Sequence, residues 1–228
     1  MDTMQSPTKQ NPTKQNPTKQ KLPTLIYEQA EWAKGVQFIA GIDEVGRGSI
    51  AGPVVAAAVV LKPHSKQEGI WSQVRDSKLL SPAKRLDMVV EIQARACAWG
   101  IGSVGPDKID EIGIAPATKL AMQAAIDALT PQPDFLLIDW VRLAQVNIAQ
   151  MSIKKADSKI VSVAAASILA KVHRDALMDK LHSQYPAYAF DQNKGYGTAV
   201  HRAAIEAHGP CPEHRFSFAP IASERTLF

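Results

Sequence analysis

The sequence has little of what marks membrane, secreted or zinc-binding proteins. No apolar run approaches the roughly 20 residues of a membrane-spanning helix, and the N-terminus lacks the apolar segment of a secretory signal. The two cysteines, Cys97 and Cys211, lie far apart and match no metal-binding spacing. We therefore expect a cytoplasmic protein with reduced thiols.

Excess charge is also scarce once the N-terminal tail is set apart. The chain of 228 residues has a formal charge of +4, but residues 1–21 hold four lysines and one aspartate, or +3 of that total. About +1 is left for the body, which therefore needs a local basic patch to bind a phosphate backbone. Hydrophobic residues make up 46% of the chain, which is enough for a sizeable core.

Residues 6–20 are three proline-containing pentads, SPTKQ, NPTKQ and NPTKQ. Such a repeat cannot pack a core, so we expect residues 1–22 to be a disordered basic tail and residues 23–228 to be the folded domain. The tail is either solvated and dispensable or a weak, salt-sensitive grip on nucleic acid.

The body is organised around residues 37–61, QFIAGIDEVGRGSIAGPVVAAAVVL. Two apolar runs of strand character flank a short segment with two adjacent acids, Asp43 and Glu44, and the triplet Gly46, Arg47 and Gly48. The connection is too short for a helix, so the two strands are expected to pair as an antiparallel hairpin. On composition alone, a turn with solvated acids is an equal alternative.

The remaining pattern alternates helices and strands. In the second half of the helical stretch over residues 106–129, Leu120, Ala124 and Leu129 share one apolar face. A hairpin followed by crossover connections predicts a mixed sheet with helices on both sides. Further strands are expected over residues 96–104, 135–139 and 146–153, and helices over residues 24–34, 82–98, 106–129 (broken at Gly113), 158–183 and 198–208.

Four acids stand at the ends of these elements: Asp43 and Glu44 after the first strand, Asp139 after the strand FLLID, and Asp157 before the longest helix. Strand ends line the crevice in which α/β sheets bind ligands. Clustered carboxylates without a Cys/His set favour Mg²⁺ or Mn²⁺, and two such ions can cleave a phosphodiester. Taken singly, Asp139 can be a turn residue and Asp157 a helix N-cap.

The motifs GIDEVGRG, FLLID, ADSKIVSVAAASILAKVHRD and NKGYGTAVHRAAIEAHGPCPEHRFSF, in this order, resemble those of type 2 ribonuclease H, or ribonuclease HII. The resemblance covers roughly residues 36–220. It implies a ribonuclease H-like fold, a mixed five-stranded sheet flanked by helices, with a C-terminal helical segment. It also implies a hydrolase of RNA–DNA hybrids and of DNA with single embedded ribonucleotides, acting in ribonucleotide excision repair. The sequence does not indicate an oligomeric state, so a monomer is the default expectation, and without a long apolar run we expect no membrane partner.

By this resemblance, Asp43, Glu44, Asp139 and Asp157 are the catalytic metal ligands for Mg²⁺ or Mn²⁺. The triplet Gly46, Arg47 and Gly48, together with Tyr196, would recognise the junction between a ribonucleotide and the DNA that follows it. Tyr196 can stack on the next sugar, and core packing is the alternative for this ring. Lys78 and Lys171, with Lys194 and Arg174, are candidate phosphate contacts, and solvated helix charges are an equal interpretation of these four.

Three positions depart from the family pattern. Trp140 follows the third acid, where the family usually has glycine, and Ala156 precedes the fourth, where the family often has glycine. Asn193 stands where histidine is common. Trp140 would either narrow the groove or turn outward.

Two rival functions remain open. Type 3 ribonuclease H shares the four acids but usually carries a folded N-terminal substrate-binding domain. A hybrid-binding protein without turnover would use the acids only as structural groups.

Overall fold

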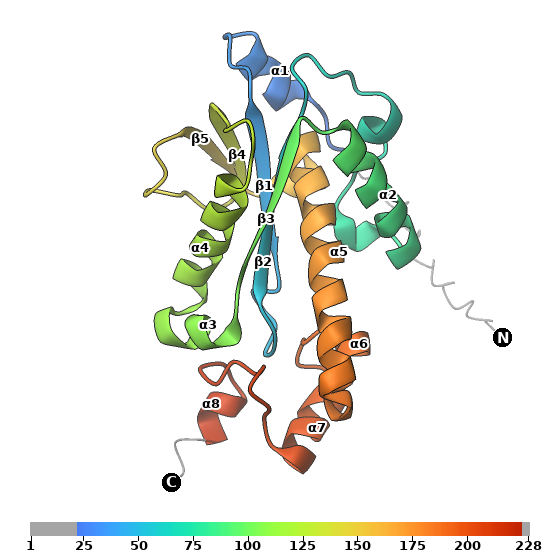
Figure 1. Cartoon of the computed structure of the whole chain (residues 1–228), viewed down its shortest axis with the longest axis vertical. Coiled ribbons are helices and arrows are strands. Elements are labelled where there is room, and N and C mark those ends of the chain that lie inside the picture. The colour runs from blue at the N-terminus through green and yellow to red at the C-terminus, as the bar shows by residue number, and fades with distance from the viewer. Residues whose placement is uncertain (1–21, 225–228) are drawn as a thin grey trace, which may run out of the picture.

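The computed structural model describes residues 22–224, so the expected tail lies outside the described residues except for Leu22. Its centre is a five-stranded sheet in the order β3-β2-β1-β4-β5 (Figure 1). The strands are β1 (Ile39–Val45), β2 (Val54–Val60), β3 (Ala98–Val104), β4 (Phe135–Asp139) and β5 (Ala149–Ile153). The helices are α1 (Ile26–Trp32), α2 (Pro82–Arg95), α3 (Pro106–Ile112), α4 (Ile114–Asp127), α5 (Val161–Gln184), α6 (Phe190–Asn193), α7 (Ala199–His208) and α8 (Ile221–Glu224), with 3₁₀ turns η1 (Gly69–Ser72), η2 (Ser77–Leu79), η3 (Ala156–Ser158) and η4 (Pro186–Tyr188).

The predicted hairpin is confirmed. Strands β1 and β2 pair antiparallel, with Asp43 opposite Ala57, and β3 continues the antiparallel order on the far side of β2. All seven residues of β2 are buried, as a β-branched and alanine run covered on both faces requires.

The second half of the sheet is parallel. The chain leaves β3, passes through α3 and α4 and returns as β4 beside β1, and β5 then pairs parallel to β4. This crossover completes the predicted mixed sheet and brings the ends of β1 and β4 to the same side.

Helices cover both faces of the sheet. Figure 1 shows α5 and α2 on one side and α3 and α4 on the other, with α7 and α8 beyond one end of the sheet. Each face has its own apolar cluster, and a third cluster joins Ile50 and Ala51 to the C-terminal helices through Met178, Phe190 and Ile205.

Two close approaches explain the small residues of the strands. A side chain at Gly41 would overlap the backbone of Ser162 in α5, and side chains at Gly100 or Gly102 would overlap backbone carbonyls of α4. Helix α4 therefore turns its small residues to the sheet, and Leu120 and Ala124 are exposed. The apolar face proposed from Leu120 and Ala124 is thus wrong, although Leu129 is buried.

Among residues 22–224, no helix has the length and apolar character that crossing a membrane requires.

Candidate active site

Asp43 and Glu44 lie near the end of β1. Asp43 is on the same side of the strand as Gly41, facing α5 and the Ser167 side chain, and only 6% of it is exposed. Its Oδ1 accepts a hydrogen bond from the Glu44 N–H at 2.8 Å. A strand end thus holds two carboxylates, one of them almost out of water.

Asp139 lies beside this pair. Ile42 is the partner of Ile138 in the parallel pairing of β1 and β4, so Asp139 ends its strand next to Asp43. Asp139 Oδ1 accepts a hydrogen bond from the Ala156 N–H at 2.9 Å, which fixes η3 and its residue Asp157 against the end of β4. Four acids from three separate segments therefore meet at one edge of the sheet.

Asp157 is not the N-cap of the long helix, so that alternative is wrong. Helix α5 begins at Val161, and its Ser162 N–H donates to Oε1 of Glu28 at 2.8 Å. Glu28 is fully buried, and burial raises its pKa while the Ser162 hydrogen bond works against that rise. Glu28 thus caps the start of α5. The sequence gives no indication of this contact, because Glu28 has the pattern of an ordinary surface acid in a short helix.

Burial and neighbouring charges raise the pKa values of Asp43, Glu44 and Asp157. Burial, and then the charge of Glu44, hold the pKa of Asp43 well above its ordinary value, with smaller contributions from Asp139 and Asp157. Burial also raises the pKa of Glu44, against the effects of Trp140 and Arg47. For Asp157, burial raises the pKa, followed by the charges of Asp76 and Asp139. Such mutual repulsion is relieved by a cation.

The donor chemistry fits a divalent metal. Glu44 Oε2 is buried without a hydrogen-bond partner, which is costly unless something outside the chain completes it. Within residues 22–224, no three Asp, Glu, His or Cys side chains are already arranged as a metal-binding cluster. The four acids therefore supply hard oxygen donors that are close together but not yet in a coordinating arrangement. Some of their side chains would have to rotate to bind Mg²⁺ or Mn²⁺.

Trp140 turns toward the acids and remains partly in solvent. Its Nε1–H donates to Glu44 Oε1 at 3.3 Å, and the Arg47 guanidinium lies 4.0 Å above its ring. Trp140 has a φ of 47°, a left-handed conformation that only glycine adopts without strain. This backbone conformation favours glycine, the residue expected here from the family pattern, and the contacts with Glu44 and Arg47 hold the larger residue in place.

Two buried arginines hold the segment after the Gly-Arg-Gly triplet. Arg174 donates to the carbonyls of Pro53, Lys194 and Ala51, and Arg215 donates to those of Gly52 and Arg47. Both are fully buried, and burial, followed by the charge of Arg174, lowers the pKa of Arg215 to about 9. The interpretation of Arg174 as a phosphate contact or a solvated charge is therefore wrong.

Tyr196 lies on a loop that is joined to the same segment. The Gly195 carbonyl accepts hydrogen bonds from the Ile50 N–H at 2.9 Å and the Ala51 N–H at 3.2 Å. Tyr196 is 39% exposed, so the alternative of core packing is wrong for this residue. Asn193 is a structural residue, because its side chain donates to the Tyr188 carbonyl and accepts from the Gly195 N–H.

A buried pair of histidines supports the Tyr196 loop, and its hydrogen bonds define both tautomers. The Tyr196 carbonyl and His201 Nδ1 are 2.9 Å apart, so Nδ1 carries the proton. His201 Nε2 is then the acceptor for His214 Nε2–H at 3.0 Å, and His214 Nδ1 accepts from the Cys211 N–H. A neutral relay thus ties the Tyr196 backbone to the loop before Arg215.

The predicted lysines differ in their partners. Lys78 Nζ lies 3.9 Å from both Asp76 and Asp157; burial works to lower the pKa of Lys78, and these two acids raise it overall. Lys171 is paired with Asp175 at 2.6 Å, and Lys194 is paired with Asp179. Of these three lysines, Lys78 is the one that the structure places beside the candidate catalytic acids.

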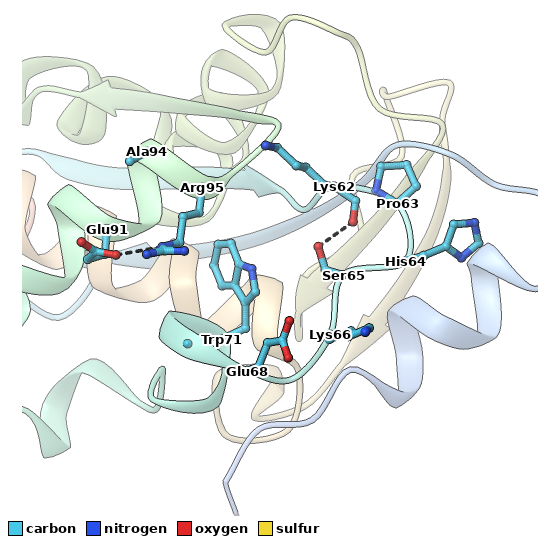
Figure 2. A pocket seen from close by; sticks show the side chains of 11 residues that line it. Lys62, Pro63, His64, Ser65, Lys66, Glu68, Trp71, Glu91, Ala94 and Arg95 are labelled. Carbon is cyan, nitrogen blue, oxygen red and sulfur yellow. Dashed lines mark hydrogen bonds and ion pairs between the residues drawn. The ribbon is translucent and has the colours of Figure 1, made fainter.

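A separate surface hollow lies away from these acids. Figure 2 shows this hollow, of about 740 Å³, between the loop after β2 and the end of α2. Its lining includes Lys62, Lys66 and the ion pair of Arg95 with Glu91. None of the predicted site residues lines it.

Comparison with known proteins agrees with this geometry. The family model described as Ribonuclease HII matches residues 40–221, which include all four acids and Tyr196. The chain belongs to the ribonuclease HII family. It is therefore an enzyme, an endoribonuclease of the ribonuclease H class.

Ribonuclease HII relatives match almost the whole described chain. That of Dehalococcoides mccartyi is 48% identical over 200 residues, 87% of this chain and 93% of its own length. That of Bacillus thuringiensis is 54% identical over 195 residues, 86% of this chain and 74% of its own. The crystal structure of ribonuclease H2 from Pyrococcus horikoshii OT3 is similar with a TM-score of 0.70 and 26% identity, over 82% of this chain and 98% of that one. The ribonuclease H-like fold expected from the motifs is thus confirmed.

Proposed function

We propose that the protein cleaves RNA–DNA hybrids, including duplex DNA with one embedded ribonucleotide, on the 5′ side of that ribonucleotide. The products are a 3′-hydroxyl and a 5′-phosphate. The observation that carries this proposal is a contact between the Tyr196 loop and the segment after the Gly-Arg-Gly triplet. The Gly195 carbonyl accepts hydrogen bonds from the N–H groups of Ile50 and Ala51. An exposed tyrosine thereby stands beside the Gly-Arg-Gly loop and the end of β1, where Asp43 and Glu44 lie.

Asp43, Glu44, Asp139 and Asp157 would hold Mg²⁺ or Mn²⁺. When bound, a pair of such ions activates water and stabilises the leaving oxygen of a phosphodiester. The chain's own acids are suited to this role by their mutual repulsion and by the unpartnered Glu44 Oε2. Lys78, beside Asp157, carries a positive charge that can face the scissile phosphate.

The junction would be recognised by backbone groups and one ring. A 2′-hydroxyl is the only difference between the two kinds of sugar. Gly48 has no atom within 4 Å of the place where its side chain would be, so a sugar can approach its backbone closely. Arg47 Nε is buried without a hydrogen-bond partner, and a phosphate oxygen would complete it. Tyr196 would stack on the sugar of the following deoxynucleotide.

We further propose that the protein works as a monomer in a reducing compartment such as the cytoplasm. Both cysteines, Cys97 and Cys211, are free thiols, which suits such a compartment. Lys171 stays a proposed phosphate contact, for which it has to exchange its ion pair with Asp175 for one with the substrate.

The test uses an end-labelled DNA duplex with one ribonucleotide, incubated with Mg²⁺ or Mn²⁺. The expected result is a single cut 5′ of the ribonucleotide, which Asp43→Asn abolishes and Tyr196→Ala weakens. A uniform RNA–DNA hybrid serves as the second substrate. Cutting of the hybrid alone would favour a type 3 activity, and no cutting of either substrate would refute the proposal.

A further inference from the structure

A second hollow, of about 580 Å³, lies directly beside the third acid. It is lined by Asp139, Trp140, Ser152, Lys154 and Lys155. These residues come from the end of β4, the edge strand β5 and the turn that leads into η3. Of them, only Asp139 belongs to the predicted site.

The two lysines of this hollow are free of acidic partners. Both are exposed, and no carboxylate of residues 22–222 lies within 4.0 Å of either ammonium group. Lys171 and Lys194, by contrast, each form an ion pair with an aspartate of α5. Two unpaired positive charges therefore lie beside Asp139, at this edge of a body that is otherwise nearly neutral.

The third feature of the hollow is a fixed aromatic ring. Trp140 is 45% exposed, yet its Nε1 is bonded to Glu44, Arg47 covers its ring, and its backbone N–H donates to the Ile153 carbonyl at 3.2 Å. A ring held this firmly loses little conformational freedom when a ligand packs against it. Basic side chains bind backbone phosphates whatever the sequence, and single-strand-binding proteins combine them with aromatic rings. An exposed ring beside two lysines can likewise contact a nucleic-acid strand without reading its sequence.

We propose that this hollow is an additional nucleic-acid subsite, in which Lys154 and Lys155 bind backbone phosphates and Trp140 packs against the sugar between them. The inference rests on the proposed function. The Tyr196 loop is attached to residues 50–51, whereas this hollow is built on β4 and β5. The subsite thus extends the contact with the substrate beyond the junction, in a way that does not depend on sequence.

The first test measures binding of a DNA duplex with one ribonucleotide, in EDTA so that no cleavage occurs, over a range of salt concentrations. Each phosphate contact adds about 0.9 to the slope of log K against log salt, so Lys154→Gln/Lys155→Gln should lower the magnitude of that slope by about 1.8. The matched control is Lys62→Gln/Lys66→Gln in the hollow of Figure 2, which should leave the slope unchanged. An unchanged slope in the first variant, or an equal fall in the control, would overturn the subsite.

The second test follows the ring. Trp140→Leu should weaken binding in EDTA by about fivefold or more at every salt concentration without altering the slope, because the lost contact is uncharged. Adding duplex should also quench the tryptophan fluorescence that Trp140 contributes, and this part of the quenching should be missing in Trp140→Phe. If duplex quenches wild type and Trp140→Phe equally, the ring does not touch the substrate.

Failure of the subsite and failure of the proposed function are distinguishable. If the wild-type protein with Mg²⁺ or Mn²⁺ cuts 5′ of the ribonucleotide but the lysine variant keeps the wild-type salt slope, only the subsite is wrong. If the wild-type protein neither binds nor cuts this duplex, the proposed function fails and the subsite fails with it.

Discussion

Gly46 packs directly against the side chain of Arg174. A Cβ at Gly46 would overlap Nε of that arginine, and Gly46 has a φ of +87°. Arg174 cannot move aside easily, because it is fully buried and donates to three carbonyls. The first glycine of the triplet is therefore required by the fold itself, whatever the substrate is.

Gly46→Ala should be strongly destabilising. Left-handed backbone strain of about 1–2 kcal/mol adds to the displacement of a buried, hydrogen-bonded guanidinium, so we expect a loss of about 2–4 kcal/mol in the free energy of unfolding. Urea denaturation measures it. Gly48→Ala is the matched control, since Gly48 has free space around it, and it should change stability by less than about 0.5 kcal/mol. Equal stability of the two variants would show that the Arg174 side chain moves aside at little cost in free energy.

The same control variant tests substrate recognition. Because Gly48→Ala leaves the fold intact, any loss of cleavage reports the approach of the substrate to that backbone. We expect cleavage of a single-ribonucleotide duplex to fall at least about tenfold, equivalent to about 1.4 kcal/mol. Unchanged kcat/KM would remove Gly48 from the recognition site.

Asp43→Asn should stabilise the metal-free protein at pH 8. The pKa of Asp43 is raised by burial and then by Glu44, so its ionised form destabilises the fold as pH rises through the folded-state pKa. The amide removes that charge and can still accept the Glu44 N–H. Each 1 kcal/mol regained should raise Tm by about 2–4 °C in a chain of this size, measured by thermal unfolding in EDTA. A lower Tm would mean that the carboxylate is net stabilising without metal.

Divalent ions should reverse the order of the two Tm values, so that wild type becomes more stable than Asp43→Asn. Mg²⁺ or Mn²⁺ that binds only the folded wild type raises its Tm with concentration. Asp43→Asn, with one candidate ligand fewer, should show a much smaller rise. Parallel rises in both proteins would exclude Asp43 from the metal site.

The histidine relay makes stability depend on pH. Burial, and then His201, lower the pKa of His214 to about 4, whereas an unfolded histidine titrates near 6.5. Between these values only the unfolded chain binds the proton, so the free energy of unfolding falls as the pH falls. From pH 7 to about pH 5 the loss from His214 should be about 2 kcal/mol.

Urea denaturation at the two pH values checks this, and His214→Gln should show a correspondingly smaller fall. His208→Gln, which alters an exposed histidine of α7, should keep the wild-type fall. Identical pH dependence in wild type and His214→Gln would contradict the neutral relay.

Much of this architecture was predictable because the sheet is encoded locally. The apolar runs around residues 39–45, 54–60 and 135–139 are short, the first two hold several β-branched residues, and the hairpin and crossover follow from the spacing of the three runs. The acids were also identifiable, since each ends or begins an element within a recognisable motif. The parallel pairing of β1 with β4 brings Asp139 beside Asp43 and Glu44, and the hydrogen bond from the Ala156 N–H to Asp139 brings Asp157 to the same place.

What the sequence could not indicate depends on long-range packing. Helix α4 buries alanines and exposes Leu120, because the glycines of β3 allow the small face to approach. Arg174 resembles a surface charge of a helix until the carbonyls of residues 51, 53 and 194 surround it. Glu28 caps a helix 134 residues further along the chain. In each case the partner is distant in sequence and leaves no local pattern.

The most direct measurement of the central claim moves the ribonucleotide. A set of end-labelled duplexes, identical except that the single ribonucleotide shifts by one position, is cut in Mg²⁺ or Mn²⁺ and the products are sized. The account predicts one cut per duplex, always 5′ of the ribonucleotide, with a 3′-hydroxyl and a 5′-phosphate, and none with Asp43→Asn. A cut that stays in place as the ribonucleotide moves, or that persists in Asp43→Asn, would contradict it.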